Sequence, residues 1–305
     1  MMIPTIIRRS LPVLSAFGAL TSAVRAADPA PTHADVRYGE NPRNVLDVWL
    51  AKSDTPTPLV IYIHGGGFKS GDKAKLHQTE VLNSFLEAGI SVAAINYRYM
   101  TGELLGVRAS LYDSRRAVQF IRSQAGEWNI DKRRIGAFGG SAGTGMALWL
   151  GFHDDMAEPK SSDPVLREST RLAVVGGENA QATYDLLRWP EFLPVDKAQP
   201  NLWRFFGLAN AAELDSPKGR AVRAELDMLG LMSKDDAPMY VSNRTTRADD
   251  LNHDPRHAAA LKKRADEVGL EAVVYAPSLG LSPAPGADVS LVEFFVKHLK
   301  PKLSL

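Results

Sequence analysis

Ser141 has the clearest chemical signature in this chain. It stands in Gly139-Gly-Ser-Ala-Gly143, a G-x-S-x-G pattern between two apolar stretches, 134–138 and 146–152. On a sharp turn between a strand and a helix, a serine hydroxyl is lifted clear of the sheet, beside the positive N-terminus of the helix. The pattern therefore predicts a nucleophilic serine, with the backbone N–H of Ala142 directed at the charge that develops during attack.

A glycine-rich stretch, His64-Gly65-Gly66-Gly67-Phe68, follows the apolar run 59–63. Glycines let backbone N–H groups converge on an oxyanion, so Gly66 and Gly67, with Ala142, are the predicted oxyanion hole. An ordinary tight connection between a strand and a helix is the alternative interpretation. A phosphate-binding loop is disfavoured because no G-x-x-x-x-G-K-[ST] pattern follows. His64 is expected to brace the loop rather than to carry a proton.

With both motifs in this order, the chain resembles the α/β-hydrolases of the hormone-sensitive-lipase and carboxylesterase-like group, in which HGGG precedes a GxSAG turn. The resemblance covers essentially the whole mature chain, from the strand expected at 44–51 to the helix expected at 288–298. It implies a serine nucleophile, an Asp or Glu after a late strand, and a His base after the last strand. Enzymes of this group cleave carboxylic esters, often short acyl or aryl esters and acetyl or feruloyl groups on carbohydrate.

The chain departs from that group at the base. The loop 276–286, after the predicted last strand, contains no histidine. Serine without a base is a poor nucleophile at neutral pH. Of the seven histidines, His253 and His257 follow the predicted strand 238–242, where the resemblance places the acid. His253 is the candidate base, with a structural or binding role as the alternative, whereas His257 shares a helical face with Leu261 and is expected to pack.

Several carboxylates compete for the role of acid. Asp250 best matches the position that the resemblance implies. The alternative interpretation of Asp249 and Asp250 is that both are solvated loop carboxylates. Asp254, directly before Pro255, is predicted to cap a helix. Glu178 is a reserve acid, because it follows a strand that borders the serine turn.

The elements that must position these residues alternate between strands and helices. This alternation predicts a mostly parallel central sheet with helices on both faces, in a single domain with a helical cap inserted at about 180–236. The resemblance implies that this sheet has the α/β-hydrolase fold. Aromatic residues concentrate in the cap, where they line an acyl pocket or pack the cap onto the core: Trp189, Phe192, Trp203, Phe205 and Phe206. Strands are expected at 35–38, 44–51, 59–63, 90–97, 134–138, 171–176, 238–242 and 271–275, and helices at 76–88, 107–126, 146–152, 255–268 and 288–298.

Composition excludes several classes of protein. The 305 residues are 45% hydrophobic and 23% charged, which suits a large buried core. A net charge of +1 provides no general attraction to nucleic acid. The absence of cysteine removes disulfides, thiolate metal sites and cysteine nucleophiles. His153-Asp154-Asp155 is interpreted as a solvated helix end rather than a metal site, and no cofactor is expected.

The N-terminus predicts export. Arg8-Arg9 precedes a moderately apolar stretch, 11–23, and the small residues that end at Ala26. This order is typical of a secretory signal over 1–26, and the paired arginines resemble a twin-arginine signal. A disordered tail is the alternative. No stretch is apolar enough to span a membrane.

The sequence as a whole therefore predicts a periplasmic or secreted serine carboxylic ester hydrolase. It would act through an acyl-enzyme at Ser141, with Asp250 and His253. The resemblance implies short-chain, aryl or carbohydrate-linked esters as substrates. A binding protein that kept the serine turn but lost the base is the alternative.

Overall fold

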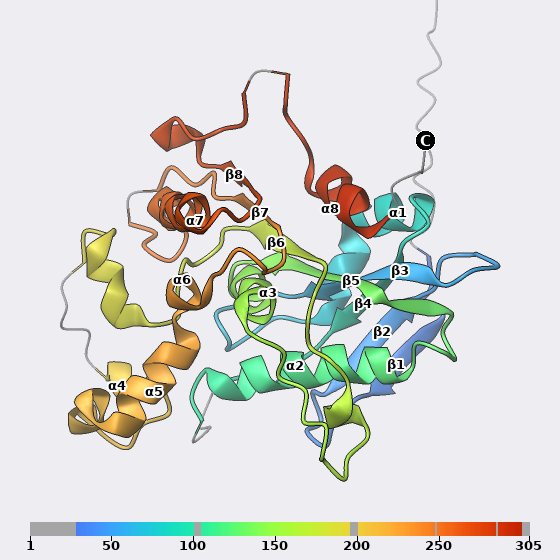
Figure 1. Ribbon diagram of the computed structural model, residues 1–305, viewed down its shortest axis with the longest axis horizontal. Helices are drawn as coiled ribbons and strands as arrows, with labels where there is room; N and C mark the ends of the chain where they lie inside the picture. The colour runs from blue at the N-terminus through green and yellow to red at the C-terminus, as the bar shows by residue number, and fades with distance from the viewer. Residues whose placement is uncertain (1–28, 101–104, 196–200, 248, 285, 301–305) are drawn as a thin grey trace, which may run out of the picture.

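One mixed sheet forms the centre of the molecule (Figure 1). The computed structural model describes residues 29–100, 105–195, 201–247, 249–284 and 286–300, so the predicted export signal lies outside the described residues. Within these ranges, the strand order is β1-β2-β4-β3-β5-β6-β7-β8. The strands are β1 (His33–Arg37), β2 (Val45–Trp49), β3 (Thr57–Ile63), β4 (Ser91–Ile95), β5 (Ile130–Gly140), β6 (Val174–Glu178), β7 (Met239–Ser242) and β8 (Ala272–Tyr275).

The pairing of the strands follows their composition. β1 pairs antiparallel with β2, and β2 pairs antiparallel with β4, while the six strands from β4 to β8 along the sheet run parallel in the described structure. β3 carries four apolar side chains with no exposed surface, Leu59, Val60, Ile61 and Ile63. Such continuous burial is typical of a parallel strand that is covered on both faces.

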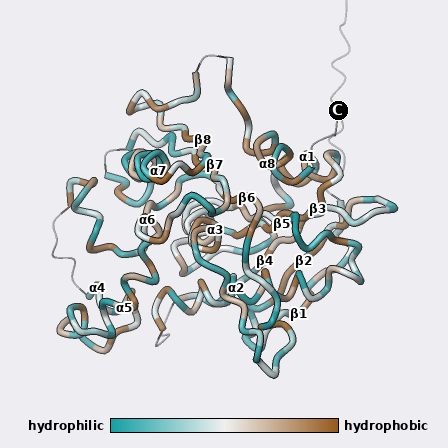
Figure 2. The backbone as a smooth tube through the Cα atoms, in the orientation of Figure 1, coloured by the Kyte–Doolittle hydropathy of each residue, from teal (hydrophilic) through white to brown (hydrophobic). Residues whose placement is uncertain are grey.

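Two hydrophobic cores lie on the two faces of the sheet. On one face, α1 (Glu80–Glu87) and α8 (Leu291–Leu299) pack Phe85 and Phe295 against β5, and Phe294 of α8 packs against Tyr240 of β7. On the other face, α2 (Arg108–Ser123), α3 (Ala142–Phe152) and α7 (Pro255–Val268) contribute to the larger core. Figure 2 shows that the outer helix α7 is more hydrophilic than the central strands. The predicted α/β-hydrolase fold is thereby confirmed.

Short helices fill the chain between β6 and β7, where the cap was expected. α5 begins at Pro217 and is capped by the Ser216 side chain, which accepts from the N–H of Gly219. Leu226 and Phe206 have no exposed surface, so this segment is packed onto the core. Its elements are η3 (Leu186–Glu191), α4 (Leu202–Phe205), η4 (Ala211–Asp215), α5 (Pro217–Leu226) and α6 (Met228–Leu231).

The helix expected at 76–88 is two elements rather than one. η1 (Lys73–Gln78) is followed by Thr79, whose extended backbone (φ −119°, ψ 144°) separates it from the start of α1. Two further short helices, η2 (Val165–Arg167) and η5 (Pro277–Leu279), lie in connecting loops. None of the helices in the described part of the chain is long and apolar enough to cross a membrane.

Candidate active site

Ser141 lies on the turn that joins β5 to α3. Its backbone angles, φ 53° and ψ −122°, are strained for a residue with a side chain. The turn is possible because its neighbours are small: a Cβ on Gly139 or on Gly143 would overlap the carbonyl oxygen of Ile63 on the adjacent strand. The Ser141 N–H donates to the Glu178 carbonyl oxygen at 2.9 Å, which fastens the turn to β6.

A histidine and an aspartate line up behind the serine hydroxyl. The Nε2 atom of His253 lies 2.8 Å from the Oγ atom of Ser141, and its Nδ1 atom lies 2.7 Å from Oδ2 of Asp250. A carboxylate can only accept, so Nδ1 carries the proton and Nε2 is free to accept from the hydroxyl. Such an arrangement can remove the serine proton during nucleophilic attack.

Asp250 and His253 belong to one tight turn in the loop after β7. The His253 N–H donates to the Asp250 carbonyl oxygen at 3.2 Å, and the Asp250 N–H donates to that of Arg247, also at 3.2 Å. The two side chains remain partly accessible, with 21% of the Asp250 side chain and 27% of the His253 side chain exposed. The aspartate and the histidine therefore reach Ser141 from a single loop.

The other predicted candidates lie outside this constellation. Asp254 caps α7, where its side chain accepts from the N–H of Arg256 at 2.8 Å. Asp249 is exposed and pairs with Arg247 at 3.1 Å, and hydrogen bonding from that arginine lowers the pKa of Asp249. Glu178 takes part through its backbone carbonyl, while its side chain is exposed.

The glycine loop places unpaired N–H groups beside the serine. Gly66 and Gly67 have positive φ angles of 117° and 59°, which side chains rarely adopt. Within the described residues, the N–H groups of Gly66, Gly67 and Ala142 donate to no protein acceptor. All three residues line the same cavity as Ser141. Free donors converging on one cavity can stabilise a negatively charged oxygen.

His64 lies behind this loop. Its ring has no exposed surface, stacks on Tyr97 at 4.3 Å, and has Nδ1 2.7 Å from the carbonyl oxygen of Gly65. Arg43 donates to the carbonyl oxygen of Gly71 at 3.0 Å and lies 3.4 Å from the His64 ring. Burial lowers the pKa of His64 to about 4, so the ring is neutral at pH 7. It braces the loop, as expected.

A cavity of about 620 Å³ opens in front of Ser141. The cap supplies part of its wall: of the aromatic residues singled out in the sequence, Trp189 and Phe205 line it. The other three do not, and Phe206 is fully buried in the core. The remaining apolar lining consists of Phe68, Met100, Tyr184 and Leu186, and the polar lining includes Lys69, Gln181 and Asn252.

Tyr184 was not recognised from the sequence. Its hydroxyl donates to the Ala142 carbonyl oxygen at 2.9 Å, and its ring packs edge-on against Phe68 at 5.3 Å. It thus joins the serine helix, the glycine loop and the cap. A possible signal was Gly145, a glycine inside an apolar helix, where an added Cβ would overlap the tyrosine hydroxyl.

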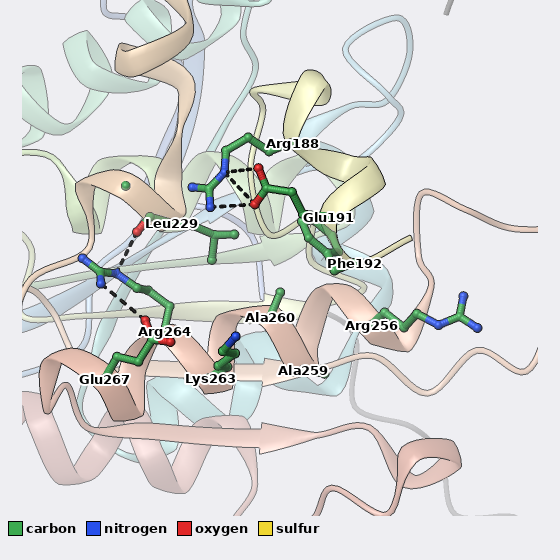
Figure 3. Close-up of a pocket in the computed structure, with 11 residues that line it drawn as sticks. Arg188, Glu191, Phe192, Leu229, Arg256, Ala259, Ala260, Lys263, Arg264 and Glu267 are labelled. Carbon is green, nitrogen blue, oxygen red and sulfur yellow. Dashed lines mark hydrogen bonds and ion pairs between the residues drawn. The ribbon is translucent and has the colours of Figure 1, made fainter. Parts of the chain in front are cut away.

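A second cavity of about 610 Å³ lies between η3 and α7 (Figure 3). Arg188 pairs with Glu191 at 2.9 Å, and Arg264 donates to the Leu229 carbonyl oxygen at 2.9 Å. Among its described lining residues there is no hydroxyl, thiol or imidazole group. The described lining of the second cavity therefore does not repeat the pairing of a serine with a histidine that is found in the first cavity.

The polar residues after α3 are used within the protein. His153 Nε2 lies 3.2 Å from the Glu225 carbonyl oxygen, and Asp155 accepts from the Thr170 N–H at 2.8 Å. In the described ranges, no three His, Cys, Asp or Glu side chains are grouped so that they could hold a metal ion.

Comparison with known proteins agrees with the fold and the motifs. Residues 46–184 match the BD-FAE family. The chain is 31% identical over 138 residues to a probable isoprenylcysteine alpha-carbonyl methylesterase of Arabidopsis thaliana, a match that covers 44% of this chain and 28% of that protein. The chain spans less than half the length of the curated relatives it matches.

Solved structures share the architecture at low sequence identity. A truncated carbohydrate esterase from gut microbiota superimposes with a TM-score of 0.63 at 18% identity, over 81% of this chain and 87% of that one. Esterase 2 of Thermogutta terrifontis, phosphonylated by sarin, gives a TM-score of 0.57 at 20% identity, over 80% and 83% of the two chains. Sheet order and solved structures thus show the α/β-hydrolase fold that the two motifs predicted. The family match and the curated relatives show that close to half of the chain is similar to esterases.

Proposed function

We propose that the chain is an exported serine hydrolase of carboxylic esters. The observation that carries the proposal is the line of contacts from Ser141 Oγ to His253 Nε2 at 2.8 Å, and from His253 Nδ1 to Asp250 at 2.7 Å. The alternative of an inactive binding protein rested on the missing histidine in 276–286, and these contacts weigh against it. Export rests on the sequence of residues 1–26 alone.

The proposed reaction has two steps. Ser141 Oγ attacks the ester carbonyl carbon while its proton passes to His253 Nε2, and Asp250 stabilises the imidazolium through Nδ1–H. The carbonyl oxygen becomes an oxyanion that accepts from the N–H groups of Gly66, Gly67 and Ala142. The C–O bond to the alcohol then breaks, and the alcohol leaves with the proton from His253. Water then attacks the acyl carbon while His253 takes its proton, the bond from that carbon to Ser141 Oγ breaks, and His253 returns the proton to Oγ as the acid leaves.

The proposed substrates are short-chain, aryl or acetyl esters, including esters on carbohydrate. A cavity of about 620 Å³ with an aromatic wall of Phe68, Trp189 and Phe205 accommodates a small acyl or aryl group. One structural neighbour is described as a carbohydrate esterase and another as an acetyl ester-xyloside bifunctional hydrolase, which favours a sugar as the alcohol.

An aryl acetate assay tests the proposal. Wild type should release the phenol, whereas Ser141→Ala and His253→Ala should each lower kcat by roughly three orders of magnitude or more, because triad members act as a unit. A serine-directed phosphonate should label wild type and not Ser141→Ala. Ser123→Ala, a serine on α2 bonded to the Phe120 carbonyl oxygen, is the control. A wild-type protein with neither turnover nor labelling would refute the proposal.

The export proposal has its own test. The mature protein isolated from its native host should begin at Ala27, and Edman sequencing or intact mass measures this. Retention of Met1 would contradict it.

A further inference from the structure

The loop that carries Asp250 and His253 is tied to the chain after β6 by a buried histidine. His257 Nδ1 accepts from the Ala182 N–H at 3.1 Å, and its Nε2 lies 3.0 Å from the Leu251 carbonyl oxygen. Leu251 directly follows Asp250. Because a carbonyl oxygen only accepts, Nε2 carries the proton, and the ring satisfies both backbone groups only as a neutral imidazole.

From these contacts we infer that His257 is a positioning residue for the triad, which holds the turn from Asp250 to His253 against the Ala182 backbone and so keeps His253 within reach of Ser141. The inference rests on the proposed function for its catalytic consequence. The two hydrogen bonds of His257, to Ala182 and to Leu251, are called the clamp below, and their presence can be tested without measuring activity.

Packing fixes the His257 ring between the two cavities. The ring has no exposed surface and meets Trp189 edge-on at 4.9 Å and Phe192 at 5.4 Å. Both aromatic residues belong to the η3 region: Trp189 lines the cavity in front of Ser141, and Phe192 lines the second cavity (Figure 3). A buried ring that packs against two aromatic side chains can transmit a fixed position to the loop it bonds.

The electrostatic surroundings keep the ring neutral. Burial lowers the pKa of His257 to about 4. The hydrogen bond to the Leu251 carbonyl oxygen and the charge of Asp254 oppose this effect, and His253 adds a small further lowering of the pKa. On η3, the charged groups are Arg188 and Glu191, which pair with each other at 2.9 Å in the second cavity. At neutral pH both hydrogen bonds of the clamp are therefore available.

A second tie supports the same loop. Gln181 donates from Nε2 to the Asn252 carbonyl oxygen at 2.9 Å, and Gln181 itself lines the cavity beside Ser141. Two consecutive carbonyl oxygens of the loop are thus held: that of Asn252 directly by Gln181, and that of Leu251 by His257, which is itself bonded to Ala182. Because 27% of the His253 side chain is exposed, the hydrogen bonds from Gln181 and His257 to its loop contribute to fixing its position.

The experiment compares three variants by kcat and KM on an aryl acetate. His257→Phe keeps the packing but removes both hydrogen bonds, and should lower kcat about 10–100-fold with KM changed less than about threefold, because a shift of order 1 Å costs about that much. His257→Gln carries an acceptor and a donor, and should recover most of the loss. His153→Phe is the matched control, since His153 also bonds a backbone carbonyl and meets Trp149 edge-on at 4.7 Å. It should lower the melting temperature without changing kcat.

Two measurements need no turnover. Nitrogen NMR of wild type at pH 7 should find His257 with its proton on Nε2, and hydrogen exchange at the Ala182 amide should be at least tenfold faster in His257→Phe than in wild type. A proton on Nδ1, unchanged exchange, or an unchanged kcat in folded His257→Phe would overturn the inference. If wild type hydrolyses no ester while tautomer and exchange behave as expected, the proposed function fails and the clamp stands.

Discussion

Acidification should destabilise the protein through two buried histidines. His64 and His257 have no exposed surface, and burial lowers the pKa of each from 6.5 to about 4. As pH falls below 6.5, the unfolded chain binds protons that the folded protein cannot accept. The stability contributed by each neutral ring is therefore complete above pH 6.5 and is lost progressively down to about pH 4.

The size of the effect follows from the two pKa values. A shift from 6.5 to about 4 corresponds to about 3 kcal/mol for each ring over the whole range. Between pH 7.5 and pH 4.5, the linkage relation gives about 2.5 kcal/mol per histidine, or about 5 kcal/mol for both. This is a large share of the ~5–15 kcal/mol that stabilises a typical domain.

Urea unfolding at pH 7.5 and pH 4.5, at constant ionic strength, measures the effect. The loss of unfolding free energy on acidification should be about 2.5 kcal/mol smaller in His257→Gln than in wild type, because glutamine does not titrate. Carboxylates with lowered pKa values, such as Asp131 and Glu271, titrate alike in both proteins, so their contributions cancel when the two losses are compared. Equal losses in the two proteins would refute a neutral, buried His257.

Four further substitutions have defined outcomes. Gly145→Ala, whose Cβ would overlap a tyrosine hydroxyl, should cost about 1–3 kcal/mol in urea unfolding. Gly66→Ala, whose Cβ would overlap a backbone carbonyl, should lower kcat about 10²–10³-fold, whereas Gly67→Ala, with open space around its Cβ, should fold with a penalty of only about 1–2 kcal/mol. Asp113→Ala should cost about 3 kcal/mol by thermal unfolding, since it leaves the Arg98 guanidinium, bonded at 2.9 Å, without that carboxylate.

The serine turn and the glycine loop could be recognised from the sequence because local residues determine them. A strand, a run of small residues and an apolar helix are contiguous around Ser141. The cap was harder, because its helices are short and include 3₁₀ turns whose periodicity is weak. Tyr184 was missed because its role depends on a contact with Ala142, 42 residues away.

Whether His253 approaches Ser141 could not be decided from the sequence, where the two residues are 112 positions apart. Only the resemblance located the loop after the strand 238–242 on the relevant edge of the sheet. The hydrogen bond between His253 and Ser141 depends on how far the loop after β7 extends over β6, and no local sequence pattern encodes that reach. The break at Thr79 was missed for a similar reason, since the residues on both sides have ordinary helix propensity.

The strand order explains how one loop can provide both acid and base. β7 is the second strand from β5 and β8 the third, so at about 4.8 Å per strand the loop after β7 starts about 10 Å from the serine turn and the loop after β8 about 14 Å. A base from the β7 loop thus has the shorter distance to cover. Because Asp250 and His253 share one turn, any displacement of the loop disturbs both contacts of the triad together. The proposed activity should therefore depend on the ties that hold this loop, of which His257 is the most deeply buried.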